Sequence, residues 1–109
     1  MTYPVRRFDH AKIVNVVDGD TCDIEVDLGF SVKVKHRFRL AGINTPERGQ
    51  PGWDAATNFL RTCMDKPAVL EVTKLDKYGR YLATIFADSV NLNAQMLTLG
   101  LAVPYGAPA

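Results

Sequence analysis

The sequence predicts a mainly β domain with two α-helices, in which five strands can close into a barrel. Three observations predict this class. Several stretches alternate apolar and polar residues, as half-buried strands do, and two others repeat apolar residues at helical spacing. Turns rich in Gly, Pro and Asp separate them. At 109 residues, with 47% hydrophobic and 23% charged residues, the chain has the length and composition of one globular domain.

The first half of the chain predicts three strands. The first is expected over residues 8–17, and Asp18-Gly19-Asp20 follows as a turn typical of hairpins. The second covers residues 20–28, and the third extends over residues 31–43. The odd positions of the third strand form a row of cations on one side: Lys33, Lys35, Arg37 and Arg39. Such a row is either a solvated face or part of a nucleic-acid surface, because a polyanion would relieve the repulsion between like charges.

The second half predicts a helix, a β-hairpin and a second helix. The first helix is expected over residues 53–65, with a core-facing stripe of Ala55, Ala56, Phe59, Leu60, Cys63 and Met64. Strands are expected over residues 68–75 and 81–87, joined by a turn. The second helix should cover residues 91–99, capped by Gly100, with an apolar face of Leu92, Met96, Leu97 and Leu99. Residues 103–109 are too rich in Pro and Gly to be regular.

These elements describe a five-stranded meander that closes on itself, which predicts an OB-fold barrel with two helices. We expect a single domain over residues 1–109, with its core over about residues 8–105 and a short irregular C-terminal tail. No apolar run approaches the ~20 residues of a membrane span, and no apolar segment follows the basic N-terminal residues as in a signal peptide. We therefore expect a cytoplasmic monomer without membrane association, compatible with a phage, plasmid or bacterial origin.

The two cysteines and the overall charge narrow the function classes. Cys22 and Cys63 lack the spacing of a zinc site and are expected to be free, buried thiols. A net charge of only +1 argues against a protein held to nucleic acid by its overall charge, although a local basic patch stays open.

Polar side chains concentrate in the stretch from Arg39 to Glu47, which leaves a strand and enters a tight corner. A guanidinium, an amide, a hydroxyl and a carboxylate fall within these nine residues. Pro46 fixes its own φ and keeps Thr45 out of helical geometry, so the corner should be stiff. A stiff corner suits a phosphate or cation site, because its groups are already in position. Taken alone, the stretch could equally be a capped turn at the end of a strand.

Three segments of the chain, in order, resemble the signature segments of the staphylococcal nuclease (thermonuclease) family. They are Asp18-Gly19-Asp20-Thr21, then Phe38-Arg39-Leu40 leading to Asn44-Thr45-Pro46-Glu47, then Asp76-Lys77-Tyr78-Gly79-Arg80. Val90-Asn91 and Leu99-Gly100-Leu101-Ala102 resemble the family's next landmark. Each segment alone is common, but their order on a five-strand pattern, over about residues 10 to 105, makes the resemblance specific.

The resemblance implies a calcium-dependent nuclease that hydrolyses phosphodiester bonds of DNA and/or RNA by metal-assisted attack of water. Asp20 would bind Ca²⁺ through its carboxylate, with further oxygens from Asn44 and the Thr45 backbone. Calcium prefers such oxygen ligands. The family's usual residue at position 44 is aspartate, so Asn44 removes one negative charge and should weaken the cation site.

The resemblance also assigns the groups that would act on the phosphodiester. Arg39 and Arg80 would hold the scissile phosphate, and a guanidinium suits this task because its planar fork donates two parallel hydrogen bonds. Glu47 would be the base, or the positioning group, for the attacking water. Three further residues are implied as substrate contacts: Lys77, Tyr78 and, through base stacking, Tyr105.

A second interpretation remains open. OB-folds commonly bind single-stranded nucleic acid without cleaving it, and the missing acid at position 44 is compatible with a catalytically weak or inactive binding module. Glu47 and Arg80 favour an enzyme, since simple binding requires neither. A structural or adaptor domain without a nucleic-acid role is a third interpretation, which the arginine pair disfavours.

Overall fold

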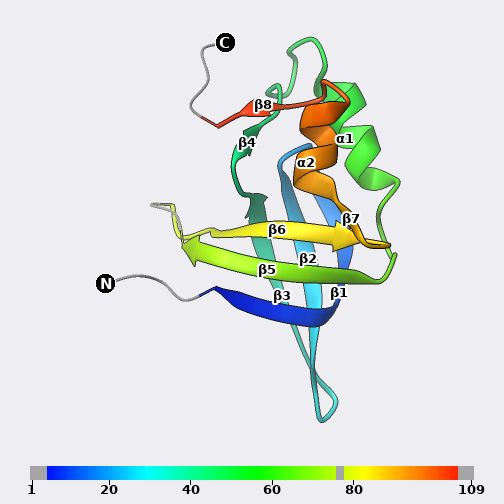
Figure 1. The fold of residues 1–109 in the computed structure, drawn as a ribbon, viewed down its shortest axis with the longest axis vertical. Coiled ribbons are helices and arrows are strands. Elements are labelled where there is room, and N and C mark those ends of the chain that lie inside the picture. Colours follow the sequence, from blue (N-terminus) through cyan, green and yellow to red (C-terminus); the bar gives the residue numbers. More distant parts are fainter. Residues whose placement is uncertain (1–4, 76–77, 106–109) are drawn as a thin grey trace.

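The computed structural model describes residues 5–75 and 78–105 and shows a closed five-stranded β-barrel with two helices at one end (Figure 1). The barrel strands are β1 (Arg6–Asp18), β2 (Thr21–Gly29), β3 (Val32–Leu40), β5 (Ala68–Leu75) and β6 (Tyr81–Ala87). Three short strands are β4 (Ile43–Asn44), β7 (Val90–Asn91) and β8 (Val103–Pro104). The helices are α1 (Trp53–Arg61) and α2 (Leu92–Thr98). The predicted mainly β, OB-fold architecture is confirmed. Neither helix has the length and hydropathy that spanning a membrane requires.

The strand order differs from the simple meander that the sequence predicts. The order is β3-β2-β1-β5-β6, because β5 pairs with β1 and not with β3. The barrel closes through a parallel pairing of β3 with β6, in which Phe38 lies opposite Tyr81 and Leu40 opposite Ala83. As a result, the C-terminal end of β3 lies beside the N-terminal end of β6.

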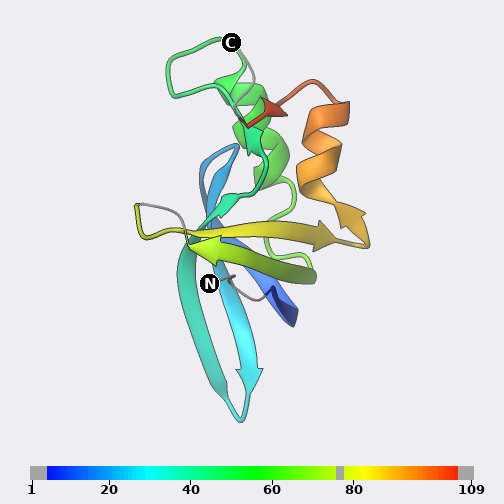
Figure 2. The same cartoon turned by 60° about the vertical axis from the view of Figure 1, so that its left-hand side comes forward.

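The hairpin of β2 and β3 projects beyond the barrel at the end opposite α1 (Figure 2). Its outer part has no core to cover, so Val32 is 48% exposed, whereas Phe38 and Leu40 are buried. The third strand also ends earlier than predicted. It stops at Leu40, because Gly42 adopts φ +78° and turns the chain before β4 begins.

Acidic residues of β2 lie directly opposite the row of cations on β3. Lys33 pairs in register with Asp27, Lys35 with Glu25, and Arg37 with Asp23: the Arg37 Nε and Asp23 Oδ1 atoms are 2.9 Å apart. The hydrogen bond from Arg37 lowers the pKa of Asp23. The hairpin therefore relieves the repulsion within the row itself, and the row gives no reason of its own to expect a polyanion there.

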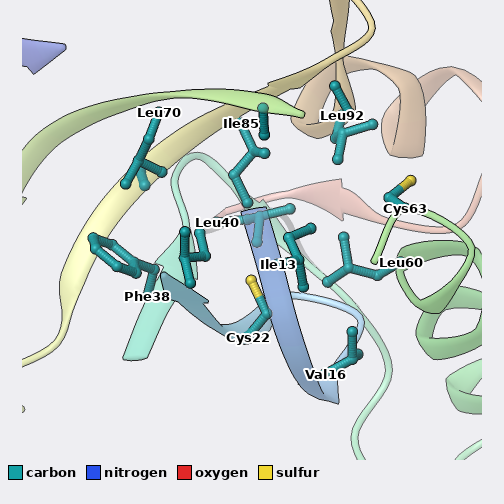
Figure 3. Close-up of a cluster of buried hydrophobic side chains, with 14 of the residues drawn as sticks. Ile13, Val16, Cys22, Phe38, Leu40, Leu60, Cys63, Leu70, Ile85 and Leu92 are labelled. Atoms are coloured by element: carbon teal, nitrogen blue, oxygen red, sulfur yellow. The ribbon is translucent and has the colours of Figure 1, made fainter. Parts of the chain in front are cut away.

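The core forms where the barrel meets the helices (Figure 3). Its largest fully buried side chains come from every barrel strand and from both helices, and include Ile13, Ile24, Leu40, Leu60, Leu70, Ile85 and Met96. Cys22 and Cys63 are free and buried, as predicted. Burial raises the pKa of the Cys22 thiol to about 12.

The first helix is shorter than its apolar periodicity predicts. It ends at Arg61, because the backbone N–H groups of Cys63 and Met64 bond carbonyls only three residues back, which tightens the last turn. Asp65 then adopts φ +63°, which turns the chain out of the helix. Its backbone N–H donates to the Ile13 carbonyl of β1.

The second helix and the tail correct two further predictions. Leu92 and Met96 are buried, but Leu97 and Leu99 are 37% and 50% exposed. Asn93 is buried instead, on the face that was expected to be apolar. The segment predicted to be irregular contains β8, which pairs antiparallel with β4, so Asn44 lies opposite Val103.

Candidate functional site

One end of the barrel brings together segments that are far apart in the sequence. Arg39 lies opposite Thr21 of β2 and, through the parallel pairing, opposite Leu82 of β6. Asp20 immediately precedes β2 and Arg80 immediately precedes β6, so the two residues flank the end of β3 from opposite sides. A cleft of about 790 Å³ opens at this end of the barrel.

The cleft is lined by every residue that the sequence predicts for catalysis or metal binding: Asp20, Arg39, Asn44, Thr45, Glu47 and Arg80. The structure therefore brings these residues together at one cleft, whereas their chemical roles stay predictions. Lys77 lies outside the described residues. Tyr78 and Tyr105 each contact one of the two arginines.

Asp20 is a buried residue that is held from several directions. Its Oδ1 accepts a hydrogen bond from the Thr21 hydroxyl at 3.1 Å, and its Oδ2 accepts one from the Thr45 backbone N–H at 3.1 Å. Its carbonyl accepts the N–H of Leu40 at 2.8 Å. The β1–β2 turn is thereby fixed to both the end of β3 and the corner after β4.

The turn can approach this closely because residue 19 is glycine. A Cβ on Gly19 would lie 2.7 Å from the Ala56 Cβ and 3.0 Å from the Thr45 Cγ2. Any side chain there would push the turn away from α1 and from the corner. Gly19 therefore sets the distance between Asp20 and the corner residues.

Arg39 spans the floor of the cleft. Its side chain is only 11% exposed, and its Nη2 lies 3.4 Å from Asp20 Oδ2 and hydrogen-bonds Asn44 Oδ1. Its Nη1 donates to the carbonyls of Leu40 (3.3 Å) and Ile43 (3.0 Å). These bonds orient the guanidinium and balance its charge within a partly buried site.

Two of the three oxygens expected to bind calcium face a common point. Asp20 Oδ2 and Asn44 Oδ1 both contact the same nitrogen of Arg39, so the two oxygens converge on a space that now holds a positive charge. The Thr45 hydroxyl at the same corner is buried and has no hydrogen-bond partner among the described residues. Oxygen donors that converge in this way fit Ca²⁺ by type and arrangement.

The charge of this donor set is low. No group of three or more His, Cys, Asp or Glu side chains that could hold a metal occurs in the described ranges. Asp20 is the carboxylate among the three expected ligands, while Glu47 and Asp18 also line the cleft. A cation held by these three ligands would meet one negative charge, which favours weak binding.

Glu47 extends from the exposed loop between β4 and α1. Gln50 closes this loop on itself: the Gln50 side-chain oxygen accepts the Glu47 N–H at 3.1 Å, and the Gln50 N–H donates to the Glu47 carbonyl at 2.9 Å. The backbone of Glu47 is thus held, while its carboxylate lies at the edge of the cleft in contact with water.

Each arginine of the cleft is stacked against a tyrosine. The Arg39 Cζ lies 5.2 Å from the centroid of the Tyr105 ring, and the Arg80 Cζ lies 5.2 Å from that of Tyr78. The Tyr105 N–H also donates to the Gly42 carbonyl at 2.9 Å, which continues the β4–β8 pairing. Both tyrosines are mostly exposed, so their rings remain accessible to a ligand.

Two contacts that support the site are not predicted from the sequence. Buried Asn93 accepts the N–H of Ile85 at 3.2 Å and donates to the carbonyls of Ala41 (2.9 Å) and Ala83 (3.0 Å), so α2 holds the corner against β6. The only signal for it is a polar residue within an apolar helix face. The second contact is that of Trp53, whose Nε1 donates to Asp18 Oδ1 at 2.8 Å.

Sequence comparison relates the chain to proteins of one family. Residues 37–108 match the sequence model of the Staphylococcal nuclease homologue family. The chain is 33% identical over 104 residues to protein ParB of Escherichia coli, covering 86% of this chain and 56% of that protein. It is 32% identical over 104 residues to the micrococcal nuclease of Shigella flexneri, covering 86% of this chain and 57% of that protein.

A third relative is the thermonuclease of Staphylococcus intermedius, which is 34% identical over 99 residues and matches 83% of this chain. The chain spans 56% of that thermonuclease, so it corresponds to somewhat more than half of the length of these relatives. The family match covers the segment from Arg39 to Tyr105, which includes five of the six cleft residues named above. The chain belongs to the staphylococcal nuclease homologue family.

Proposed function

We propose that this chain is a nuclease that hydrolyses phosphodiester bonds of DNA and/or RNA by metal-assisted attack of water. The observation that carries the proposal is the convergence on one cleft of two carboxylates and two guanidiniums from four separate segments: Asp20, Arg39, Glu47 and Arg80. Membership of the family supports it, as do relatives that are themselves named micrococcal nuclease and thermonuclease.

In this proposal the two arginines bind the scissile phosphate. Arg39 lies at the end of β3 and Arg80 immediately precedes β6, which pairs with β3, so a phosphate between them would meet donors from two neighbouring strands. Charge grows on the phosphoryl oxygens during attack, and fixed donors aimed at them stabilise the transition state more than the ground state. The tyrosine contacts of both guanidiniums reduce the reorientation that this requires.

Glu47 would accept the proton of the attacking water. Its carboxylate lies at the solvent edge of the cleft, and the Gln50 hydrogen bonds hold its backbone in place. A positioned general base contributes on the order of 10²–10⁴-fold in rate. Tyr78 and Lys77 would contact a neighbouring phosphate, and Tyr105 would stack on a base.

Asp20, Asn44 and Thr45 would hold the calcium ion. When bound there, Ca²⁺ would act as a Lewis acid that stabilises negative charge on the phosphoryl oxygens. Arg39 contacts the same oxygens of Asp20 and Asn44, so its guanidinium would shift from these oxygens towards the phosphate when the cation site is filled. This exchange would couple cation binding to substrate binding.

The test is an assay of the full chain on single-stranded DNA, plasmid DNA and RNA, with calcium and with a chelator, followed by analysis of the product ends. The proposal expects shortening of at least one nucleic acid with calcium and none with chelator. Intact DNA and RNA at high protein concentration with calcium would refute it.

The second candidate is a nucleic-acid-binding module with little or no turnover. The observation that favours it is the amide at position 44, which accepts a hydrogen bond from Arg39 and leaves the cation site with a single carboxylate among its three ligands. This candidate predicts that single-stranded DNA is retained by the protein at low salt but stays intact with calcium, manganese or magnesium.

A further inference from the structure

The loop between β4 and α1 carries a guanidinium that the proposed reaction does not use. Arg48 immediately follows Glu47 and is exposed. The loop itself lies at the end of the molecule farthest from the β2–β3 hairpin (Figures 1 and 2). The Gln50 hydrogen bonds to Glu47 close the loop around Arg48, and Gly49 completes the turn with φ +88°. The position of Arg48 is therefore fixed relative to Glu47.

The side chain of Arg48 is also held, by an aromatic platform. Its Cζ lies 5.0 Å from the centroid of the Trp53 ring. The indole is anchored on its other edge, where Nε1 donates to Asp18 Oδ1 at 2.8 Å. Asp18 belongs to the turn that carries Asp20, so the platform connects the Arg48 guanidinium to the wall of the cleft.

Among the described residues the charge of Arg48 has no counter-ion, in contrast to that of two arginines of β3. Arg39 contacts Asp20, and Arg37 contacts Asp23. Among the residues that the structure describes, the Arg48 guanidinium makes neither a hydrogen bond nor an ion pair. Its donors face solvent, in the fork geometry that matches a phosphate group.

The place of Arg48 suits a phosphate other than the scissile one. Glu47, Gln50 and Pro51 line the cleft, so a strand that leaves the cleft over this loop would pass Arg48. Strand β6, which Arg80 immediately precedes, lies nearer the middle of the long axis in both views (Figures 1 and 2). The two positions would therefore contact different phosphates along one strand.

We propose that Arg48, stacked on Trp53, is an additional phosphate-binding subsite that contacts a nucleotide flanking the bond to be cleaved. The proposal rests on the proposed nuclease function and adds to it that the enzyme binds a strand longer than a dinucleotide. A guanidinium already oriented by an aromatic ring loses less freedom when it binds, so the contact contributes to affinity and not to the chemical step.

The experiment compares the parent with Arg48→Gln, Arg48→Lys and the control Arg61→Gln. Arg61 is an exposed arginine of α1 that bonds only Asn58 among the described residues and does not line the cleft. Steady-state cleavage is measured on a single-stranded DNA dodecamer and on a dinucleotide. Arg48→Gln should raise KM for the dodecamer about three- to fivefold, with kcat and both constants for the dinucleotide unchanged. Arg48→Lys should fall between, and Arg61→Gln should match the parent.

A second measurement separates a phosphate contact from a structural effect. Binding of the labelled dodecamer is titrated in chelator at several salt concentrations, and the slope of log K against log salt is compared. Loss of one phosphate contact should reduce that slope by about 0.7 for Arg48→Gln. If Arg48→Gln keeps the parental slope and KM, or loses the same factor in cleavage of the dodecamer and of the dinucleotide, the subsite is overturned while the nuclease proposal stands. A parent that neither binds nor cleaves overturns both.

Discussion

Replacement of Asn44 by aspartate tests the cation site most simply, because it restores one negative charge without adding an atom of bulk. Asn44 Oδ1 and Asp20 Oδ2 both contact Arg39 Nη2, the latter at 3.4 Å. A divalent cation that binds these two oxygens would therefore displace the Arg39 guanidinium, which carries a single positive charge. We expect Asn44→Asp to favour the divalent ion in this exchange.

The size of the effect follows from the charges involved. Two unit charges about 4 Å apart interact by about 4 kcal/mol at an effective dielectric constant of ~20, and a divalent ion doubles this. The new carboxylate also holds Arg39 more firmly, which removes about half of the gain, and its desolvation removes more. A net gain of about 1.5–3 kcal/mol remains, so calcium should bind roughly ten- to a hundredfold more tightly.

Isothermal titration of calcium into the parent, Asn44→Asp and Asn58→Asp measures this change. Asn58 is an exposed residue of α1 that accepts a hydrogen bond from Arg61, so Asn58→Asp makes the same change in net charge away from the cleft. The control should bind calcium like the parent. An unchanged titration for Asn44→Asp removes position 44 from the coordination shell, and equal tightening by the control reduces the effect to net charge.

Three further predictions concern the framework of the site. Asn93→Ala should lower the free energy of unfolding, measured with urea, by about 2–3 kcal/mol, because it removes the acceptor of the buried Ile85 N–H and the amide donor of the Ala41 and Ala83 carbonyls. A loss below about 1 kcal/mol would contradict this. Cys22, with its pKa raised to about 12 by burial, should resist thiol reagents at pH 8 until the protein is unfolded in denaturant; fast labelling of the native thiol would contradict its burial. The hydrogen bond from Arg37 lowers the pKa of Asp23, so the charged Asp23 stabilises the fold fully above its ordinary pKa near 4 and loses this contribution as the pH falls through the lowered value. The difference in stability between the parent and Asp23→Asn should therefore vanish in acid. A difference that does not depend on pH would refute the assignment.

Local patterns predict most of the barrel because they record burial on one face of each strand. The alternation of Cys22, Ile24 and Val26 corresponds to three buried residues of β2, and the strands at 68–75 and 81–87 have the predicted bounds. The helix predicted over residues 53–65 ends earlier, at Arg61. Apolar residues continue at helical spacing to Cys63 and Met64, but the α-helical hydrogen bonds stop before them.

Features that depend on distant pairing could not be predicted in this way. β8 forms only because β4 lies beside it, and a strand of Val103 and Pro104 has no period to detect. Leu97 was expected to be buried and is exposed, whereas the polar Asn93 is buried. Asn93 hydrogen-bonds backbone groups of β6 and of the corner, and no local pattern reveals these partners. Arg39 and Arg80 share one cleft through the closure of β3 on β6, for which the order of motifs was the only signal.

The central claim is that the cleft activates water against a bound phosphodiester, and Glu47→Gln tests it most directly. The substitution keeps the shape of the side chain and its hydrogen-bonded backbone but removes its capacity to take a proton. Single-turnover cleavage and equilibrium binding of one labelled single-stranded DNA are measured for the parent and for Glu47→Gln with calcium. The account predicts parental binding with a rate lower by about 10²–10⁴-fold. Cleavage by Glu47→Gln at the parental rate would contradict it.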